Sequence, residues 1–211
     1  MLINIEGLIG VGKTTLCENL YGIKHFEPVE SNVFLNDYYS EPKRWAYAMQ
    51  VNLLCERFKM LQVAQFEAMD NDVILDRSFY GDYAFALVQQ REGLFTANEF
   101  KSYQNLFNMH LPYLKLPDVI IWLDAPVDLI RERIAKRSRD CECGISREYL
   151  VDLKTAYIEV LERLEKYTKV IYIDATKDAM QVLADVQNAI YVARHELLDG
   201  VATPANITFN G

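Results

Sequence analysis

The hydrophobic positions of the chain follow two alternating patterns. Short apolar runs without polar alternation indicate strands that are covered on both faces, and five occur, at residues 2–5, 25–28, 73–76, 119–123 and 170–173. Longer segments with apolar residues near helical spacing predict helices over residues 42–69, 97–110, 127–136, 147–167 and 177–198. Strands that alternate with helices predict a parallel sheet with right-handed crossovers, in one three-layer α/β domain.

Length and composition agree with this architecture. The chain has 211 residues, 51% of them hydrophobic and 25% charged, which suits a single domain with one core. We expect that domain to span residues 1–198 and the segment 199–211 to be a loosely ordered tail, because it has little periodicity. No apolar run approaches the ~20 residues needed to cross a bilayer, and no leader pattern is seen at the start. We therefore expect a cytoplasmic protein without a membrane partner.

Charge and cysteine content exclude other classes. A net charge of −8 argues against a nucleic-acid partner, because proteins that bind nucleic acid usually need a basic face. It does not argue against a small phosphate ligand, because the local electric field matters more than the net charge for such a ligand. The cysteines are expected to be reduced thiols. Cys141 and Cys143 lack two further ligands at zinc-site spacing, so we expect no metal there.

Residues 7–14 match the pattern G-x-x-x-x-G-K-[ST] directly after the first apolar run. In such a turn, exposed backbone N–H groups cradle phosphate oxygens, and the following helix adds the positive end of its dipole. Lys13 supplies a cation for the β- and γ-phosphates, and the Thr14 hydroxyl can ligate Mg²⁺. The residues expected to bind ATP are Gly7, Gly10, Val11, Gly12, Lys13, Thr14 and Thr15.

Four further features narrow the class of phosphate-binding protein. The sequence has no N-K-x-D and no D-x-x-G, which a switch GTPase would use to read guanine and sense the phosphate. Glu27 ends the second predicted strand, at the sheet edge where α/β folds bind ligands, and could take a proton from an attacking hydroxyl. Asp76 and Arg77 end the third, where the carboxylate can hold Mg²⁺ and the guanidinium can pair with an oxyanion or with Glu27. The expected charge-neutralising lid arginines are Arg133, Arg137 and Arg139.

In this order, the motifs resemble the deoxynucleoside kinase family. The resemblance rests on GLIGVGKT, Glu27-Pro28-Val29, Tyr39-x-x-Pro42-x-Arg44-Trp45 with Gln50, Asp76-Arg77-Ser78 with Asp82, and the arginines followed by Glu142. It covers residues 1–150 and is nearest in detail to bacterial or phage members. It implies a P-loop kinase fold with a five-stranded parallel sheet, an arginine-rich lid over residues 133–145, and ATP-dependent phosphorylation of a deoxynucleoside 5′-hydroxyl in nucleotide salvage.

The resemblance also implies a role for each position. Glu27 is the expected general base, Arg77 positions it, and Lys13 and the lid arginines act on the phosphates. The residues expected to bind the deoxynucleoside are Glu27, Tyr39, Gln50, Arg57, Arg77, Asp82, Phe85 and Glu142. Those expected to hold Mg²⁺ are Thr14 and Asp76. Because family members commonly dimerise through two long helices, a homodimer is expected by analogy.

The identity of the acceptor leaves alternatives open. Asp82 accepts hydrogen bonds only, when ionised, and so favours bases with an exocyclic amine: deoxyadenosine, deoxyguanosine or deoxycytidine over thymidine. A thymidylate-kinase-like nucleoside monophosphate kinase would share the P-loop, the Asp-Arg pair and the lid, but its anionic acceptor calls for a cation where Glu27 stands. A non-catalytic nucleotide-binding module would predict losses among these motifs, and we find none.

Overall fold

The computed structural model describes residues 1–27, 32–137, 145–198 and 209. Its strands are β1 (Leu2–Gly7), β2 (Ile23–His25), β3 (Val73–Asp76), β4 (Val119–Asp124) and β5 (Lys169–Asp174). They form one parallel sheet in the order β2-β3-β1-β4-β5, which confirms the predicted five-stranded parallel α/β fold. The helices are α1 (Lys13–Asn19), α2 (Leu35–Ser40), α3 (Pro42–Glu67), α4 (Phe79–Arg91), α5 (Ala97–His110), the 3₁₀ helix η1 (Leu111–Tyr113), α6 (Val127–Arg137), α7 (Arg147–Leu164) and α8 (Ala179–Leu198).

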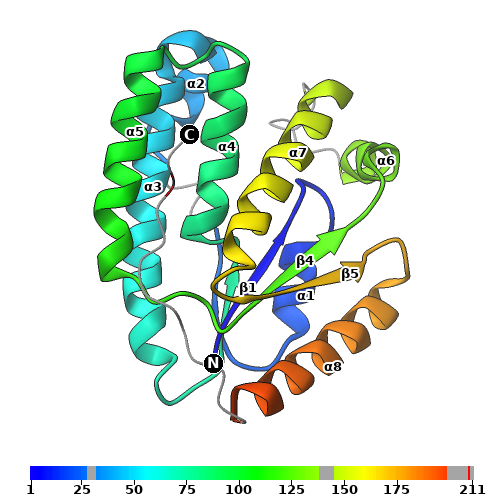
Figure 1. Ribbon diagram of the computed structural model, residues 1–211. Coiled ribbons are helices and arrows are strands. Elements are labelled where there is room, and N and C mark those ends of the chain that lie inside the picture. The colour runs from blue at the N-terminus through cyan, green and yellow to red at the C-terminus, as the bar shows by residue number, and fades with distance from the viewer. Residues whose placement is uncertain (28–31, 138–144, 199–208, 210–211) are drawn as a thin grey trace.

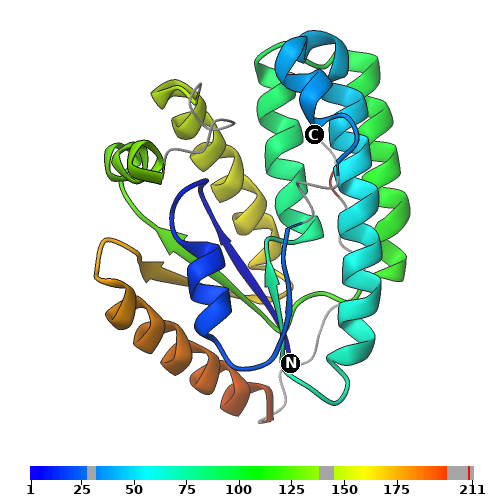
Figure 2. The ribbon, with the colours of Figure 1, turned by 180° about the vertical axis from the view of Figure 1, so that it is seen from behind.

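Helices cover both faces of the sheet (Figure 1, Figure 2). Helix α7 and the start of α4 lie on one face, α1 and α8 lie on the other, and α2 to α5 gather into a block beside the β2–β3 edge. Because all five strands are parallel, the segments that follow β1, β2 and β3 leave the sheet at the same edge. None of the described helices has both the length and the apolar run that crossing a membrane requires.

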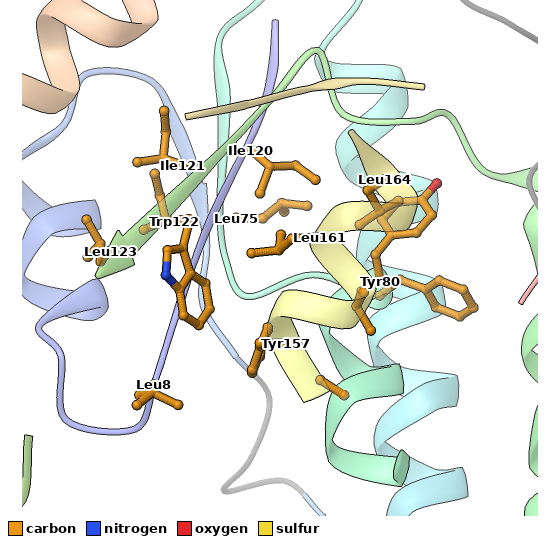
Figure 3. Close-up of a cluster of buried hydrophobic side chains, with 14 of the residues drawn as sticks. Leu8, Leu75, Tyr80, Ile120, Ile121, Trp122, Leu123, Tyr157, Leu161 and Leu164 are labelled. Carbon is orange, nitrogen blue, oxygen red and sulfur yellow. The ribbon is translucent and has the colours of Figure 1, made fainter. Parts of the chain in front are cut away.

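Buried side chains between the sheet and α7 hold this helix against one face of the sheet (Figure 3). Ile120 and Trp122 of β4 face Tyr157 and Leu161 of α7, and all four side chains are at most 1% exposed. The ring centroids of Trp122 and Tyr157 are 5.1 Å apart. This packing holds the Tyr157 ring rigidly, so its hydroxyl is a fixed point in the site described below.

Two parts of the secondary structure differ from the prediction. Strand β2 lies two residues earlier than predicted, because Ile23 pairs with Val73 and His25 with Leu75, whereas Phe26 is 43% exposed. Residues 26–27 therefore leave the sheet and can turn towards other elements. Helices α2 and α4 were not predicted individually: α2 is only six residues long, and α4 is buried along most of its length and so lacks an alternation of polar and apolar positions.

At Phe209 the structure departs from the expected loose tail. The Phe209 ring is fully buried, and its centroid lies 4.9 Å from that of Tyr83 and 5.0 Å from that of Phe107. Asn108 of α5 donates from Nδ2 to the Phe209 carbonyl over 3.0 Å and accepts from the Phe209 N–H over 2.9 Å. The other residues of the segment 199–211 lie outside the described part of the chain.

We expect Phe209→Ala to destabilise the protein by about 3–5 kcal/mol, because it empties a fully buried aromatic site. Urea denaturation at equilibrium measures this loss. Tyr21→Ala is the matched control: Tyr21 is 92% exposed, so its removal should change stability by no more than about 0.5 kcal/mol. Equal, small losses in both variants would show that Phe209 is not part of the folded core.

Candidate active site

The turn between β1 and α1 has the geometry of a phosphate-binding loop. Gly10 and Gly12 have φ angles of +79° and +110°, which only glycine adopts without strain. A Cβ on Gly10 would also lie 2.6 Å from Cγ1 of Ile134. The Lys13 Nζ donates to the carbonyls of Gly7 and Leu8, over 3.2 and 3.0 Å, so the side chain lies against the loop. Burial and the nearby Arg77 lower the pKa of Lys13 to about 8.

Thr14 and Asp76 come together beside this loop. The Thr14 hydroxyl donates to Asp76 Oδ2 over 2.6 Å. The second carboxylate oxygen, Asp76 Oδ1, is buried and has no hydrogen-bond partner among the described residues. A hydroxyl next to a carboxylate with one unused oxygen is the ligand chemistry that Mg²⁺ prefers, so these two residues fit the metal expected with ATP. The other expected ATP-binding residues lie as the loop requires, with Val11 buried in the turn and Thr15 exposed in the first turn of α1.

Glu27 lies between two arginines at the same sheet edge. Arg77 Nε donates to Glu27 Oε2 over 2.8 Å, and Arg57 Nη2 donates to Glu27 Oε1. Burial raises the pKa of this carboxyl group, but Arg77, Arg57 and Lys13 outweigh burial and leave the pKa below its usual range. The carboxylate is therefore ionised near neutral pH and fixed in orientation.

Several elements of the fold hold the Arg77 side chain in place. It is the one non-glycine residue of the described chain with a positive φ, +69°, and its Nη1 donates to the Gly7 carbonyl (3.1 Å) and to the Tyr157 hydroxyl (2.6 Å). Its guanidinium carbon lies 4.8 Å from the centroid of the Phe85 ring. Burial disfavours its charge, yet Tyr157 and Glu27 raise the pKa of Arg77 above its usual value. The P-loop, Glu27 and α7 are thus joined through one guanidinium.

The residues expected to read the base form a closed polar cluster. Asp82 accepts from Arg57 Nη1 at Oδ1 and from the Tyr103 hydroxyl at Oδ2, the latter over 2.5 Å. Gln50 donates to the Asp82 backbone carbonyl over 3.3 Å, and Gln89 donates to Gln50 Oε1 over 2.8 Å. These bonds fix the direction of the Gln50 amide, which is fully buried. Asp82 itself is fully buried, and its two carboxylate oxygens are bonded to Arg57 and Tyr103.

Several expected site residues lie apart from this cluster or outside the described residues. Tyr39, on α2, is 50% exposed. Arg133 donates to the backbone carbonyls of Val11 (3.2 Å) and Ala175 (2.9 Å), so it braces the P-loop instead of projecting freely. Phe85, which was expected to bind the deoxynucleoside, faces the guanidinium groups of Arg57 and Arg77. Of the remaining lid positions, Arg137 ends α6, and Arg139, Glu142 and the cysteines at 141 and 143 lie outside the described residues.

Sequence reasoning missed four residues that support the site. Tyr157 and Tyr103 belong to helix faces that the sequence indicates only as apolar, and Gln89 carries no motif. Glu6 directly precedes the P-loop, which is the one signal that could have singled it out. Its Oε1 accepts from Ser78 Oγ over 2.5 Å, and burial raises its pKa. Ser78 in turn accepts from the Gly81 N–H and caps α4, so Glu6 ties the start of α4 to the central strand.

The fold and the site define a P-loop phosphotransferase: a phosphate-binding loop and a carboxylate base candidate meet at one sheet edge. A model of the deoxynucleoside kinase family matches residues 3–198. Deoxyadenosine kinase of Dictyostelium discoideum is 38% identical over 82% of this chain and 71% of that protein. Deoxyadenosine/deoxycytidine kinase of Bacillus subtilis (strain 168) is 36% identical over 74% of each. A structure described as deoxyadenosine kinase from M. mycoides with the products dCMP and dCDP bound has a TM-score of 0.80 at 26% identity, over 91% of this chain and all of that one.

The chain belongs to the deoxynucleoside kinase family. The sequence-based prediction of a deoxynucleoside-phosphorylating enzyme with a P-loop kinase fold is thereby confirmed. The alternative of a nucleoside monophosphate kinase has no support in these relatives.

Proposed function

We propose that the protein transfers the γ-phosphoryl group of ATP to the 5′-hydroxyl of deoxyadenosine, deoxyguanosine or deoxycytidine in preference to thymidine, with Mg²⁺, in the cytoplasm. The observation that carries this proposal is the ionised Glu27 carboxylate at the P-loop edge of the sheet, held by Arg57 and Arg77. A neutral hydroxyl acceptor needs such a base, whereas a phosphate acceptor would be repelled by it. The relatives that are named deoxyadenosine and deoxyadenosine/deoxycytidine kinase support an amine-bearing base.

The residues then divide the reaction between them. The 5′-oxygen attacks the γ-phosphorus in line, its proton passes to Glu27, and the bond from the γ-phosphorus to the β–γ bridging oxygen breaks to release ADP. Lys13 leaves the loop carbonyls for the phosphate oxygens, and Arg77 keeps Glu27 oriented. Thr14 and Asp76 would hold Mg²⁺, which supplies neutralisation of the phosphate charge when bound. Tyr39 and Glu142 are proposed to meet the 3′-hydroxyl, and Arg133, Arg137 and Arg139 to serve the lid.

A coupled ADP-release assay tests the proposal. It would compare deoxyadenosine, deoxyguanosine, deoxycytidine, thymidine, adenosine and thymidine monophosphate with Mg²⁺-ATP. We expect turnover of at least one amine-bearing deoxynucleoside and slow turnover of thymidine. Turnover of the monophosphate alone would overturn the role of Glu27, and ATP binding without any turnover would favour the non-catalytic module.

The lowered pKa of Lys13 predicts that ATP affinity falls as pH rises. In the empty protein Lys13 loses its proton above about pH 8, whereas bound phosphate stabilises the charged form and so raises this pKa. Binding must then take up a proton, and Kd for ATP should increase by up to about tenfold per pH unit above pH 8. Isothermal titration calorimetry in buffers of different ionisation enthalpy measures both effects. In Lys13→Met the proton uptake should disappear; a pH-independent Kd in the wild type would contradict the prediction.

We also propose a homodimer that pairs the ends of α3 and α5. Large apolar side chains are exposed at and just beyond these two helix ends: Val63, Phe66, Met69, Met109 and Tyr113. Gln65 of α3 donates to the Tyr113 carbonyl over 3.2 Å, which places the two helix ends side by side. Exposed large apolar side chains on adjacent helix ends are typical of a protein interface, and the analogy with the family places the dimer contact on two long helices.

Light scattering coupled to size exclusion tests this interface. The wild type should elute with twice the mass of one chain, and Phe66→Asp should shift it to one chain mass, because a buried, unpaired charge opposes association. Tyr172→Asp, at an exposed aromatic residue of β5, is the control and should leave the mass unchanged. A wild type that elutes as one chain at micromolar concentration would contradict the proposal.

A further inference from the structure

One guanidinium group joins the two ends of the site. Arg57 of α3 donates from Nη1 to Asp82 Oδ1 and from Nη2 to Glu27 Oε1; these two contacts form the Arg57 bridge. Asp82 belongs to the first turn of α4, whereas Glu27 follows β2. Arg57 is only 1% exposed, so the bridge lies inside the protein. The carboxylate at the base-reading end and the carboxylate that takes the proton therefore share one cation.

The bridge places a guanidinium donor on each carboxylate oxygen of Glu27. Arg57 binds Oε1 and Arg77 binds Oε2. Burial raises the pKa of Glu27, but Arg77, Arg57 and Lys13 outweigh it and hold the pKa below its usual range; Tyr157 also faces this carboxylate. A carboxylate between two guanidinium groups is a weak proton acceptor. Glu27 becomes a stronger base when one of the two arginines withdraws.

Arg57 is better placed to withdraw than Arg77. Arg77 is fixed at once by the Gly7 carbonyl, the Tyr157 hydroxyl and its contact with Phe85. The Nε of Arg57, in contrast, is buried and donates to no group in the described part of the chain. Its bond from Nη1 to Asp82 can persist while Nη2 turns away from Glu27, because Asp82 is itself held by Tyr103.

A nucleobase offers acceptors to the Arg57 guanidinium, whose Nε has none among the described residues. The edges of adenine, guanine and cytosine carry ring nitrogens or carbonyl oxygens in the plane of the ring. The planar guanidinium presents its donors in a fixed fork that fits such acceptors. Gln50 precedes Arg57 by seven residues on α3, so both side chains lie on the same face of this helix and can meet one base. Water and sugar hydroxyls do not present an extended planar edge of this kind.

We propose that the Arg57 bridge makes Glu27 available as a base only when a nucleobase occupies the site. The base draws Arg57 Nη2 away from Glu27, and the freed oxygen then accepts the proton of the 5′-hydroxyl. This inference rests on the proposed function, in which Glu27 is that base. It also protects ATP: with the acceptor site empty, a water that passed its proton to Glu27 could attack the γ-phosphorus and break its bond to the bridging oxygen, releasing ADP and phosphate. The bridge keeps Glu27 from assisting that hydrolysis.

The first test needs only the wild-type protein. We expect the free nucleobase of the preferred deoxynucleoside to increase ATP hydrolysis by about 10-fold, a fraction of what a general base contributes, because the base withdraws Arg57 but offers no 5′-hydroxyl. Phosphate release from Mg²⁺-ATP measures this rate with and without the base. Hydrolysis that the free base leaves unchanged overturns the proposal, whatever any variant does.

The second test removes the bridge. Arg57→Gln should raise base-independent ATP hydrolysis by about 10-fold and abolish its stimulation by the free base, while kcat/KM for the deoxynucleoside falls. Arg91→Gln is the matched control, since Arg91 is an exposed arginine of α4 that pairs with Glu159, and it should behave as the wild type. A residue with a purely structural role would lower both activities together, and that result would contradict the bridge.

The pH dependence of the wild-type kinetics gives a third test, which needs no variant. In the wild type the acid limb of kcat, which reports the complex, should lie at higher pH than the acid limb of kcat/KM, which reports the free enzyme. Coincident limbs overturn the proposal. Failure of the proposed function is distinguishable, because no deoxynucleoside would then be phosphorylated at all. Phosphorylation without the hydrolysis and pH effects rejects the bridge alone.

Discussion

Glu27→Gln is expected to lower kcat for the preferred deoxynucleoside by about 10²–10⁴-fold, the range of general-base catalysis. Glutamine keeps the size of the side chain and one acceptor oxygen for Arg77, but it cannot take a proton. The ADP-release assay measures the loss, and the Kd for ATP, measured by calorimetry, should stay within about twofold because Glu27 lies outside the P-loop.

The matched control for this variant is Glu67→Gln. Glu67 is the last residue of α3 and accepts from His25 over 2.6 Å, at the strand that leads to Glu27, but it lies outside the site. Its replacement removes the same charge and should leave kcat within about twofold. A Glu27→Gln variant that retained more than a tenth of the wild-type kcat would show that another group accepts the proton.

The parts of this molecule that could be predicted from sequence are those whose structure is determined by residues close together in the chain. The P-loop was predictable because glycine spacing, Lys13 and Thr14 act within one turn. Helix α5 has the bounds predicted for it, and local residues set both of its ends: Thr96 and Glu99 form a capping box, and proline follows soon after His110. Strands β1, β3 and β4 carry continuous apolar runs that are buried on both faces.

The remaining features depend on residues that are distant in sequence. Nothing near Arg57 indicates that its guanidinium reaches both Asp82 and Glu27, which are 25 and 30 positions away. Phe209 belongs to a polar segment, yet its ring completes a cluster that α4 and α5 leave open. In the same way, the contacts of Arg133 with backbone carbonyls could not be inferred from a basic helix, because every residue has a carbonyl group and the sequence does not indicate which ones lie near.

Asp76→Asn is expected to lower kcat/KM by about 10²–10³-fold, corresponding to several kcal/mol of charge stabilisation through a bound metal ion. Asparagine retains the size of the side chain and can still accept the hydroxyl of Thr14, so the loop geometry is preserved. The readout that does not depend on turnover is ATP binding. In the wild type, Mg²⁺ should tighten it relative to binding in EDTA, and in the variant this difference should vanish. Asp124→Asn, at the end of β4, where Lys154 pairs with the carboxylate, is the control.

Thr14→Val separates the two roles that Asp76 could have. If the carboxylate served only to hold the Thr14 hydroxyl, removing that hydroxyl would reproduce the whole effect of Asp76→Asn. If instead the unused oxygen Oδ1 faces the cation, Thr14→Val should keep part of the Mg²⁺-dependent gain in ATP affinity, because the negative charge is still present. A buried carboxylate oxygen without a protein partner costs stability unless a ligand completes it. For this reason we expect Asp76→Asn to weaken Mg²⁺-dependent binding more than Thr14→Val, while leaving the free protein no less stable.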